Sequence, residues 1–277
     1  MLWDENYFYF GAYMEENHLW ATLTERDAII FHDNDFEIFL DPDGDTHNYY
    51  ELEVNAFNTI WDLLLLKPYR DQGRVAIDSW DIAGLKSAIH LDGTLNNPND
   101  IDKSWSIEIG IPWKVLEECA NSFHPKNGEQ WRVNFSRVHY DLDIVNGKYQ
   151  KQNKPEYNWV WSPQGLIAMH YPEMWGYVQF SENKVGSSKV KFQWNEIEDS
   201  KWYFRQLYYS QKIFHDVNKI WNSSLPQLNM PVPQNRNFKE IPQITITKRG
   251  YEIFGFHNSG NIITISEDGL IKVTPFD

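Results

Sequence analysis

Apolar and polar residues alternate in several short stretches of the first two thirds of the chain. The clearest is the segment 105–111, where Trp105, Ile107, Ile109 and Ile111 are separated by polar or small residues. A period of two is the spacing of a β-strand with one buried face. The same reasoning predicts further strands at Tyr7–Tyr13, Phe36–Leu40, Tyr49–Asn55, Trp131–Val138 and Tyr177–Phe180.

Turn residues separate these strands, and helical patterns are scarce between them. The cluster Asp41–Asp45 predicts a turn between two strands. Pro112 suits the first turn of a helix, so a short helix is predicted at Trp113–Ala120. Many short strands with few helices predict a mainly β fold, an antiparallel β-sandwich over residues 1–181.

The pattern changes after residue 181. Glu182–Ser188 resembles a linker, and a helix is predicted from Asp199 or Ser200, which are plausible caps, to about Asn222. The proline-rich stretch Ser223–Pro242 is predicted to be extended. The tail Ile244–Val273 predicts a β-hairpin. We therefore expect residues 182–277 to form a helical and β-hairpin extension packed on the sandwich.

Charge and composition exclude several classes of protein. The 277 residues include 25 Lys and Arg against 39 Asp and Glu, a formal net charge of −14. Such a chain repels phosphate backbones, so we expect no nucleic-acid partner. No apolar run approaches the length of a membrane span, so we expect no membrane partner either. Aromatic residues make up 16% of this polar chain, an excess that favours exposed stacking surfaces as well as core.

The turn at Asp41–Asp45 sets the register of the strands on either side. If their apolar residues share the core face, then Glu37 lies opposite Glu53, and Asn55 lies beyond on the same face. Two carboxylates facing each other repel, so the pair needs compensation. A cation, an arginine, a shared proton or a ligand with many hydroxyl groups could provide it.

Another predicted strand offers polar partners on one face, namely Arg132, Asn134 and Ser136. A buried structural salt-bridge network, a sugar-binding floor and a pair of catalytic carboxylates all remain open at this point. Sugars suit such a surface, because carboxylates and guanidinium groups bind their hydroxyls while an aromatic plane supports the ring. The available rings are Phe31, Trp61, Trp159, Trp161 and Trp175.

Two groups of residues raise the question of metals. Asp41, Asp43 and Asp45 form a compact acidic turn that could bind structural calcium, although turn chemistry alone also accounts for them. The histidines His32, His47, His139 and His170 lack the spacing of zinc ligands. No nucleophile elbow, phosphate loop or dinucleotide fingerprint is present.

Five segments of the chain resemble the family nine carbohydrate-binding modules, namely Leu2–Tyr9, Asp35–Asp41, Leu52–Asn55, Trp105–Trp113 and Trp175–Val178. The similarity covers roughly residues 2–181. The blocks Trp159–Pro163, Met169–Glu173 and Arg205–Gln211 look like the larger bacterial family nine-like group. The resemblance implies a β-sandwich, a saccharide ligand, bound calcium and export to the periplasm or outside the cell. The opening Met1-Leu2-Trp3-Asp4 holds no basic-then-apolar leader.

This sequence departs from the sugar clamp of the family. Characterised members hold a sugar between two tryptophans, whereas Phe31 stands at the first position and the second falls near Met169 and His170. Glu53 stands where the family uses an arginine on the sugar. The clamp chemistry is therefore not simply inherited.

These observations favour a non-catalytic protein that binds a mono- or oligosaccharide in a polar and aromatic cleft. The candidate ligand-binding residues are Phe31, Glu37, Glu53, Asn55, Trp61, Arg132, Asn134, Trp159, Trp161 and His170. The alternatives are a glycan-active enzyme that uses Glu37 and Glu53 as acid and base, and a structural domain of a cell-envelope assembly. The oligomeric state is left open.

Overall fold

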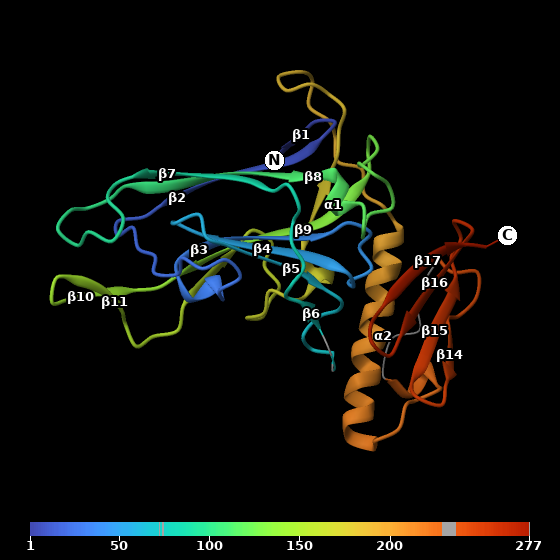
Figure 1. Cartoon of the computed structure of the whole chain (residues 1–277). Coiled ribbons are helices and arrows are strands. Elements are labelled where there is room, and N and C mark those ends of the chain that lie inside the picture. The colour runs from blue at the N-terminus through green and yellow to red at the C-terminus, as the bar shows by residue number, and fades with distance from the viewer. Residues whose placement is uncertain (72, 74, 229–236, 277) are drawn as a thin grey trace. The chain divides into compact units, whose positions relative to one another are not determined.

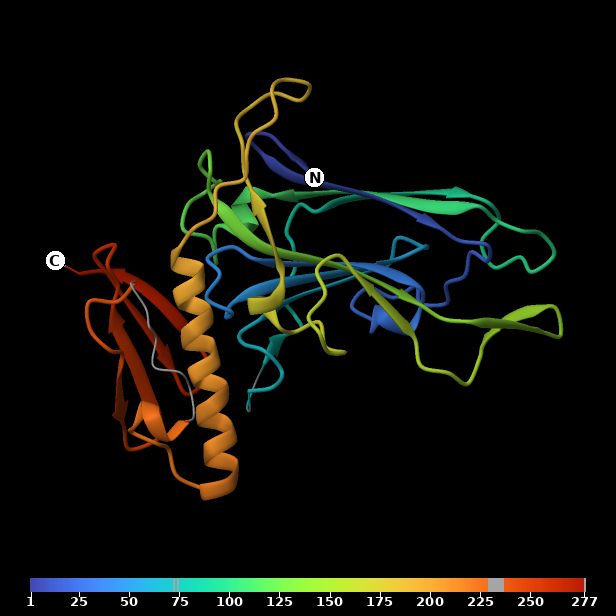
Figure 2. The same cartoon turned by 180° about the vertical axis from the view of Figure 1, so that it is seen from behind.

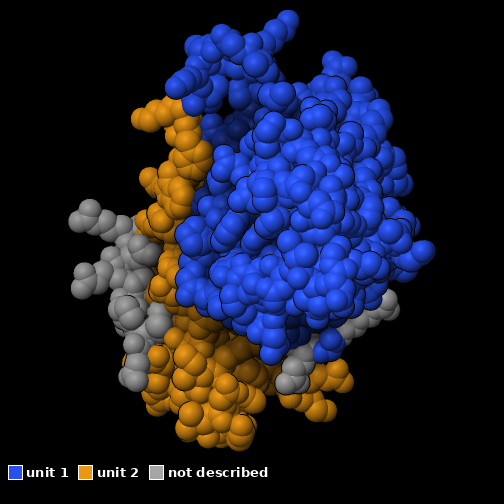
Figure 3. Space-filling view, turned by 90° about the vertical axis from the view of Figure 1, so that its left-hand side faces the viewer, with its two compact units in different colours: residues 1–44, 48–190 blue, residues 45–47, 191–277 orange. Residues whose placement is uncertain are grey.

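The computed structural model describes residues 1–71, 73, 75–228 and 237–276. The chain divides into two compact units, one of residues 1–44 and 48–190 and the other of residues 45–47 and 191–277 (Figure 3). The division after Val190 lies close to the linker expected at Glu182–Ser188. The packing of the extension on the sandwich stays a prediction.

The first unit is built on two antiparallel sheets, which lie one above the other in Figures 1 and 2. The smaller sheet has the order β1-β2-β8-β7, with β1 Leu2–Trp3, β2 Tyr7–Glu15, β8 Ser104–Pro112 and β7 Lys86–Asp92. The larger sheet has the order β12-β9-β3-β4-β5-β6, with β12 Tyr157–Val160, β9 Gln130–His139, β3 Asp35–Asp41, β4 Tyr49–Asn55, β5 Ile60–Leu65 and β6 Ala76–Ile77. Strand β13, Gly176–Gln179, also pairs with β9, and β10 Leu142–Val145 forms a separate hairpin with β11 Lys148–Lys151.

The main hydrophobic core lies between these two sheets. Its residues alternate along the strands, as in Trp105, Ile107, Ile109 and Ile111 of β8, which are all nearly inaccessible to solvent. The facing residues of β3 and β4 are Phe36, Ile38, Leu40, Tyr50, Leu52 and Val54. The prediction of a mainly β, antiparallel sandwich is therefore confirmed. No helix among the described residues is both long and apolar enough to cross a membrane.

The opposite face of the larger sheet is also largely covered. A smaller apolar cluster there includes Phe39, Tyr49, Leu63, Leu65 and Trp175. Because one face of β3 and β4 packs in the main core, their acidic residues point to this second face. The fold thus buries carboxylates under loops instead of exposing them on an open sheet.

The short helix after β8 is smaller than predicted. Helix α1 spans Trp113–Leu116 and not Trp113–Ala120. Beyond Leu116 the chain continues in turns, in which the amide N–H of Ala120 still donates to the carbonyl of Leu116.

The second unit packs one helix against a four-stranded antiparallel sheet. Helix α2 spans Ile197–Asn218, and the sheet has the order β14-β15-β16-β17, with β14 Gln243–Ile246, β15 Tyr251–Phe256, β16 Asn261–Ser266 and β17 Ile271–Pro275. Phe204, Leu207 and Tyr208 of the helix share a core with Ile253 and Ile263. The tail is therefore a four-stranded sheet where the sequence predicted a single hairpin.

The ends of α2 also differ from the prediction. The side chain of Asn195 accepts a hydrogen bond from the Ile197 amide, so the helix begins before Asp199 and Ser200. It ends at Asn218, because Lys219 adopts a left-handed conformation with φ of 58°. Part of the predicted extended stretch, residues 229–236, lies outside the described residues; Leu225–Leu228 before it forms a short 3-10 helix.

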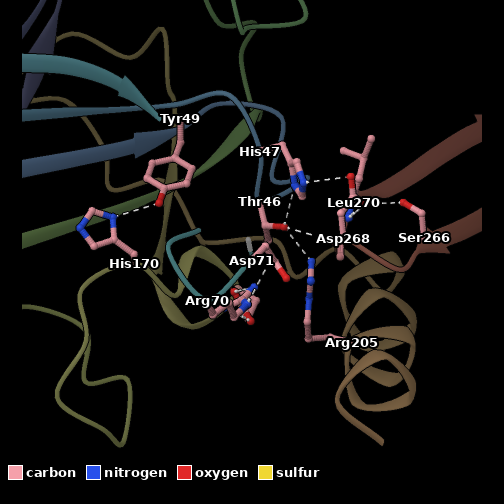
Figure 4. Close-up of polar contacts among 12 residues, drawn as sticks. Thr46, His47, Tyr49, Arg70, Asp71, His170, Arg205, Ser266, Asp268 and Leu270 are labelled. Carbon is pink, nitrogen blue, oxygen red and sulfur yellow. Dashed lines mark hydrogen bonds and ion pairs between the residues drawn. The ribbon is translucent and has the colours of Figure 1, made fainter. Parts of the chain in front are cut away.

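Residues 45–47 belong to this second unit through specific bonds. Arg205 of α2 is buried and donates from Nη2 to the Thr46 hydroxyl at 2.8 Å (Figure 4). The amide of Ile271 at the start of β17 donates to the carbonyl of Asp45. These bonds place a tight, partly left-handed turn beside the turn at Gly269.

Candidate ligand cavity

A cavity of about 570 Å³ lies over the acidic face of the larger sheet. Its floor comes from β3, β4 and β5, and its walls from β12 and the segment that follows it. The lining residues are Phe31, Glu37, Phe39, Glu51, Glu53, Trp61, Tyr69, Val138, Glu156, Asn158, Val160 and 163–170. This volume is in the usual range for a small-molecule site.

Three glutamates form the polar part of the floor. Glu37 of β3 pairs directly with Glu53 of β4, as the register predicted, and Phe39 pairs with Glu51. At most 4% of each of the three glutamates is accessible to solvent. Glu53 also accepts a hydrogen bond from the amide N–H of Phe31 at 2.8 Å. The floor is therefore a compact group of buried carboxyl groups.

Burial and mutual repulsion disfavour the charged forms of these acids. Burial raises the pKa of Glu37 to about 7, although the nearby Ser136 hydroxyl lowers it in part. Burial, followed by the charge of Glu37, holds the pKa of Glu51 and of Glu53 well above the ordinary value. The same two causes raise the pKa of Asp35, which is fully buried two residues before Glu37. The group therefore favours an occupant that lowers its negative charge.

No lysine or arginine lines the cavity among the residues that the structure describes. Elsewhere in the first unit, several acid groups have basic partners. Asp62 and Asp81, for example, both bind the guanidinium of Arg26. The absence of such a partner sets the floor glutamates apart from an ordinary salt-bridge network.

Aromatic rings form much of the remaining wall. Phe31 lies in the 3-10 helix Ile30–His32, and its ring centroid is 6.4 Å from that of Trp61, with 32° between the planes. Trp61 pairs with Glu53 across β4 and β5, so both side chains lie on one face. Tyr69 is about half exposed. Flat rings thus lie beside carboxylates, which is the combination that suits a sugar.

His170 enters the cavity from the segment before β13. The hydroxyl of Tyr49 lies 2.9 Å from its Nδ1 (Figure 4), and its Nε2 is 3.8 Å from Oε1 of Glu51. The ring of Tyr69 meets it edge-on at 4.4 Å. Burial lowers the pKa of His170 to about 3, so the imidazole is neutral at physiological pH. His170 is therefore a hydrogen-bonding group and not a counter-charge for the glutamates.

Asn55 lies near the floor but is not among the residues that line the cavity. Its Nδ2 donates to the carbonyl of Leu23 and to Asp33, and its Oδ1 accepts from the amides of Phe57 and Thr59. These four bonds use the full capacity of a carboxamide. In this structure Asn55 joins loops and has no bond left for a ligand.

Asn134 and Arg132 are also placed away from the cavity. Asn134 is fully buried and holds Ser162 through its amide and its carbonyl. Arg132 pairs with Asp41, bonds the carbonyl of Trp175 and lies 3.7 Å over the ring of Tyr177. The expected pairing of Arg132 with the floor glutamates is therefore not what the register provides.

Trp159 and Trp161 lie on the other face of the larger sheet. Trp159 pairs with Arg137, whereas its neighbour Val160 pairs with Ser136 and lines the cavity. Because side chains alternate along a strand, neither tryptophan can stack a ligand over Glu37 and Glu53. Trp159 stacks on His139 in a second cavity, of about 420 Å³, whose buried Glu16 is bonded by Arg137 at 2.7 Å. Of the rings named from the sequence, Phe31 and Trp61 reach the acidic cavity, and Trp175 is buried.

The acidic turn Asp41–Asp45 is compatible both with turn chemistry alone and with bound calcium. Asp41 accepts a hydrogen bond from the amide of Gly44 at 2.9 Å, and Asp45 accepts one from the amide of His47. These are the bonds of turn chemistry. Asp41 and Asp43 belong to the first unit and Asp45 to the second. Calcium binding by the three residues stays a prediction.

Several cavity residues were not singled out from the sequence. Glu51 alternates with Glu53, so the same register argument places it on the floor. Asp35 precedes Glu37 by two and could have been found in the same way. Tyr69 and 163–168 have no such signal, because they belong to irregular segments whose path depends on the fold.

Comparisons with known proteins give little further support. No protein-family model matches the chain, and no curated protein matches it. The chain is similar to a solved structure from Bacteroides uniformis titled "Crystal structure of a putative carbohydrate-binding protein". The identity is 19%, the TM-score is 0.41, and the match covers 62% of this chain and 72% of the other. A likeness at this level does not bear on the ligand.

Proposed function

We propose that this protein binds a mono- or oligosaccharide in the acidic cavity, without catalysing a reaction on it. The observation that carries the proposal is the placement of Glu37, Glu51 and Glu53 beside the rings of Phe31 and Trp61. Carboxylates accept the hydroxyl protons of a sugar, and an aromatic ring packs on its apolar C–H face.

The cavity favours a saccharide over an anionic metabolite. A phosphate or carboxylate ligand would have to enter a site whose described lining has four glutamates and no basic side chain. A wholly apolar ligand would leave the buried carboxylates without hydrogen-bond partners, which is costly. A molecule that presents many hydroxyls on one side and C–H groups on the other meets both demands.

Isothermal titration calorimetry against a panel of neutral mono- and oligosaccharides tests this proposal. We expect heat of binding from at least one member, and loss of that heat in Glu53→Gln. Glu108→Gln is the matched control, because Glu108 is exposed on β8 of the other sheet. Folded protein that gives no heat with any saccharide would overturn the proposal.

The same preparation separates binding from catalysis. Two opposed carboxyl groups are also found in retaining glycosidases, where one serves as acid and the other as nucleophile. Saccharides incubated with the parent protein should remain intact by chromatography. Turnover by the parent that Glu37→Gln abolishes would replace the binding function with a hydrolytic one.

A further inference from the structure

At the floor of the cavity, three carboxylates lie close together. Asp35, Glu37 and Glu53 each place an oxygen within 4.8 Å of the other two. Asp35 and Glu37 alternate on β3, and Glu53 pairs with Glu37 from β4, so all three side chains lie on one face of the sheet. All three are buried, Asp35 completely.

Buried oxygens without a hydrogen-bond partner in this cluster favour a bound ligand. Asp35 Oδ1 accepts from the amide of Val138, but its Oδ2 has no hydrogen-bond partner among the described residues, and neither does Oε2 of Glu37. The hydroxyl of Ser136, a neutral group, is only 1% exposed and interacts with the carboxyl of Glu37. Ser136 pairs with Glu37 across β3 and β9, so its hydroxyl lies beside the carboxylates. Buried polar atoms without partners are rare and need an explanation.

We propose that Asp35, Glu37 and Glu53, with the hydroxyl of Ser136, bind a divalent cation of the calcium type. The ligand atoms are all hard oxygens, three of them from carboxylates, which is the donor set of Ca²⁺ and not that of zinc or copper. Ligands on opposite sides of a calcium ion are about 4.6–5.2 Å apart, given bond lengths of about 2.3–2.6 Å. The separation of the three oxygens is compatible with one shared ion.

The depth of Asp35 favours a metal ion over an organic cation as the ligand of this cluster. Glu37 and Glu53 line the cavity, whereas Asp35 does not and lies beneath its surface. An occupant that contacts all three acids must therefore be the size of an atom.

The position of the ion gives it a role in ligand binding, an inference that rests on the proposed function. Protein oxygens surround it from the sheet side, and its remaining coordination positions face the cavity. Saccharide hydroxyls can occupy these positions in place of water. The affinity for saccharide is therefore expected to depend on the cation, whereas the affinity for the cation does not require saccharide.

The first experiment measures the cation alone. Chelator-treated protein of residues 1–277 is titrated with CaCl₂ by calorimetry, with circular dichroism to verify that each variant is folded. We expect one bound ion in the parent, its loss in Asp35→Asn and in Glu53→Gln, and its retention in Glu108→Gln and Asp43→Asn. No bound ion, or an ion lost only in Asp43→Asn, overturns the proposal, and the second result assigns the ion to the acidic turn.

Terbium gives a readout that places the ion. Trp61 pairs with Glu53 and lines the cavity, so Tb³⁺ at the cluster should give emission sensitised by this tryptophan and reversed by Ca²⁺. Trp61→Phe should lose most of the sensitised emission while calorimetry still detects Ca²⁺, and Trp159→Phe should keep the emission. Emission that survives in Trp61→Phe and is lost in Trp159→Phe places the ion elsewhere and overturns the proposal.

Saccharide titrations with and without Ca²⁺ separate this inference from the proposed function. Binding that requires Ca²⁺ supports both. Binding of equal affinity in chelator, by protein that also takes up no Ca²⁺, overturns the cation site and leaves the saccharide site standing. Ca²⁺ binding without any saccharide binding supports the cation site and overturns the saccharide site.

Discussion

Glu37 and Glu53 face each other directly across β3 and β4, almost wholly removed from solvent. Like charges in this position repel, and burial adds the cost of desolvation. Nothing in the alternation of the apolar core requires acids here, since a β-branched or aromatic residue would satisfy the second face of the sheet. The pair is therefore a feature of the site more than of the fold.

The first prediction concerns stability against pH with divalent cations chelated. The pKa of Glu37 in the folded protein, about 7, lies above its ordinary value of 4.5, so folded protein holds a proton that the unfolded chain has released. The stability that this proton supports is present below about pH 4.5 and is lost as the pH rises through about 7. We expect Glu37→Gln to be more stable than the parent by a margin that grows across this interval, measured by urea unfolding.

His170 does not obscure this comparison. Because its pKa is lowered, His170 makes stability fall as the pH drops through the ordinary histidine range toward about 3. This trend is opposite to that of Glu37, but it occurs equally in the parent and in Glu37→Gln. The prediction would be contradicted if the difference in free energy of unfolding between Glu37→Gln and the parent stayed constant from about pH 4.5 to about pH 7.

The second prediction concerns His170 itself. Because burial lowers its pKa to about 3, its ring signals in NMR spectra should stay constant from about pH 8 to about pH 5. The signals are assigned by comparison with His170→Gln. A titration midpoint near 6.5, the ordinary histidine value, would show that the ring is more open to water than the structure has it.

The third prediction separates the two faces of the larger sheet. Trp61→Ala should weaken saccharide binding by about five- to ten-fold, because it removes a stacking ring worth about 1–1.4 kcal/mol. Trp159→Ala should leave the affinity unchanged, since Trp159 lies on the opposite face. Calorimetry of the two variants measures this, and a reversed order would move the binding site to the Trp159 cavity.

The fourth prediction separates a structural amide from a cavity amide. Asn55→Ala leaves the amides of Phe57 and Thr59 without their partner and removes one of the donors to Asp33, so it should lower the free energy of unfolding by about 1–3 kcal/mol. Asn158 is exposed and lines the cavity, so Asn158→Ala should leave stability nearly unchanged. Urea denaturation of both variants is the measurement, and equal stabilities would refute the assignment.

The sandwich and the register of β3 with β4 could be predicted from the sequence, because both follow from the alternation of apolar and polar residues along these strands. Once Ile38 and Leu52 face the core, the positions of Glu37 and Glu53 are determined. Alternation within 159–161 does not show which face of the sheet Trp159 and Trp161 occupy, because that depends on the residue of β9 that lies opposite. That pairing is a long-range contact that alternation within β12 alone does not reveal.

Polar roles were the hardest to predict. Asn55 alternates correctly with Glu53, yet its four hydrogen bonds lead to Leu23, Asp33, Phe57 and Thr59, which only the folded loops bring near. In α2, Arg205 and Gln211 belong to the buried face, whereas the apolar Val217 is 78% exposed. Burial of polar groups is determined by their partners, which hydropathy does not encode.

A crystal structure of the protein grown with Ca²⁺ and its best saccharide would test the central claim most directly. We predict a sugar ring against Trp61, with hydroxyls directed to Glu53 and to an ion held by Asp35 and Glu37. A saccharide seated beside Trp159, with the acidic cavity filled only by solvent, would contradict the account.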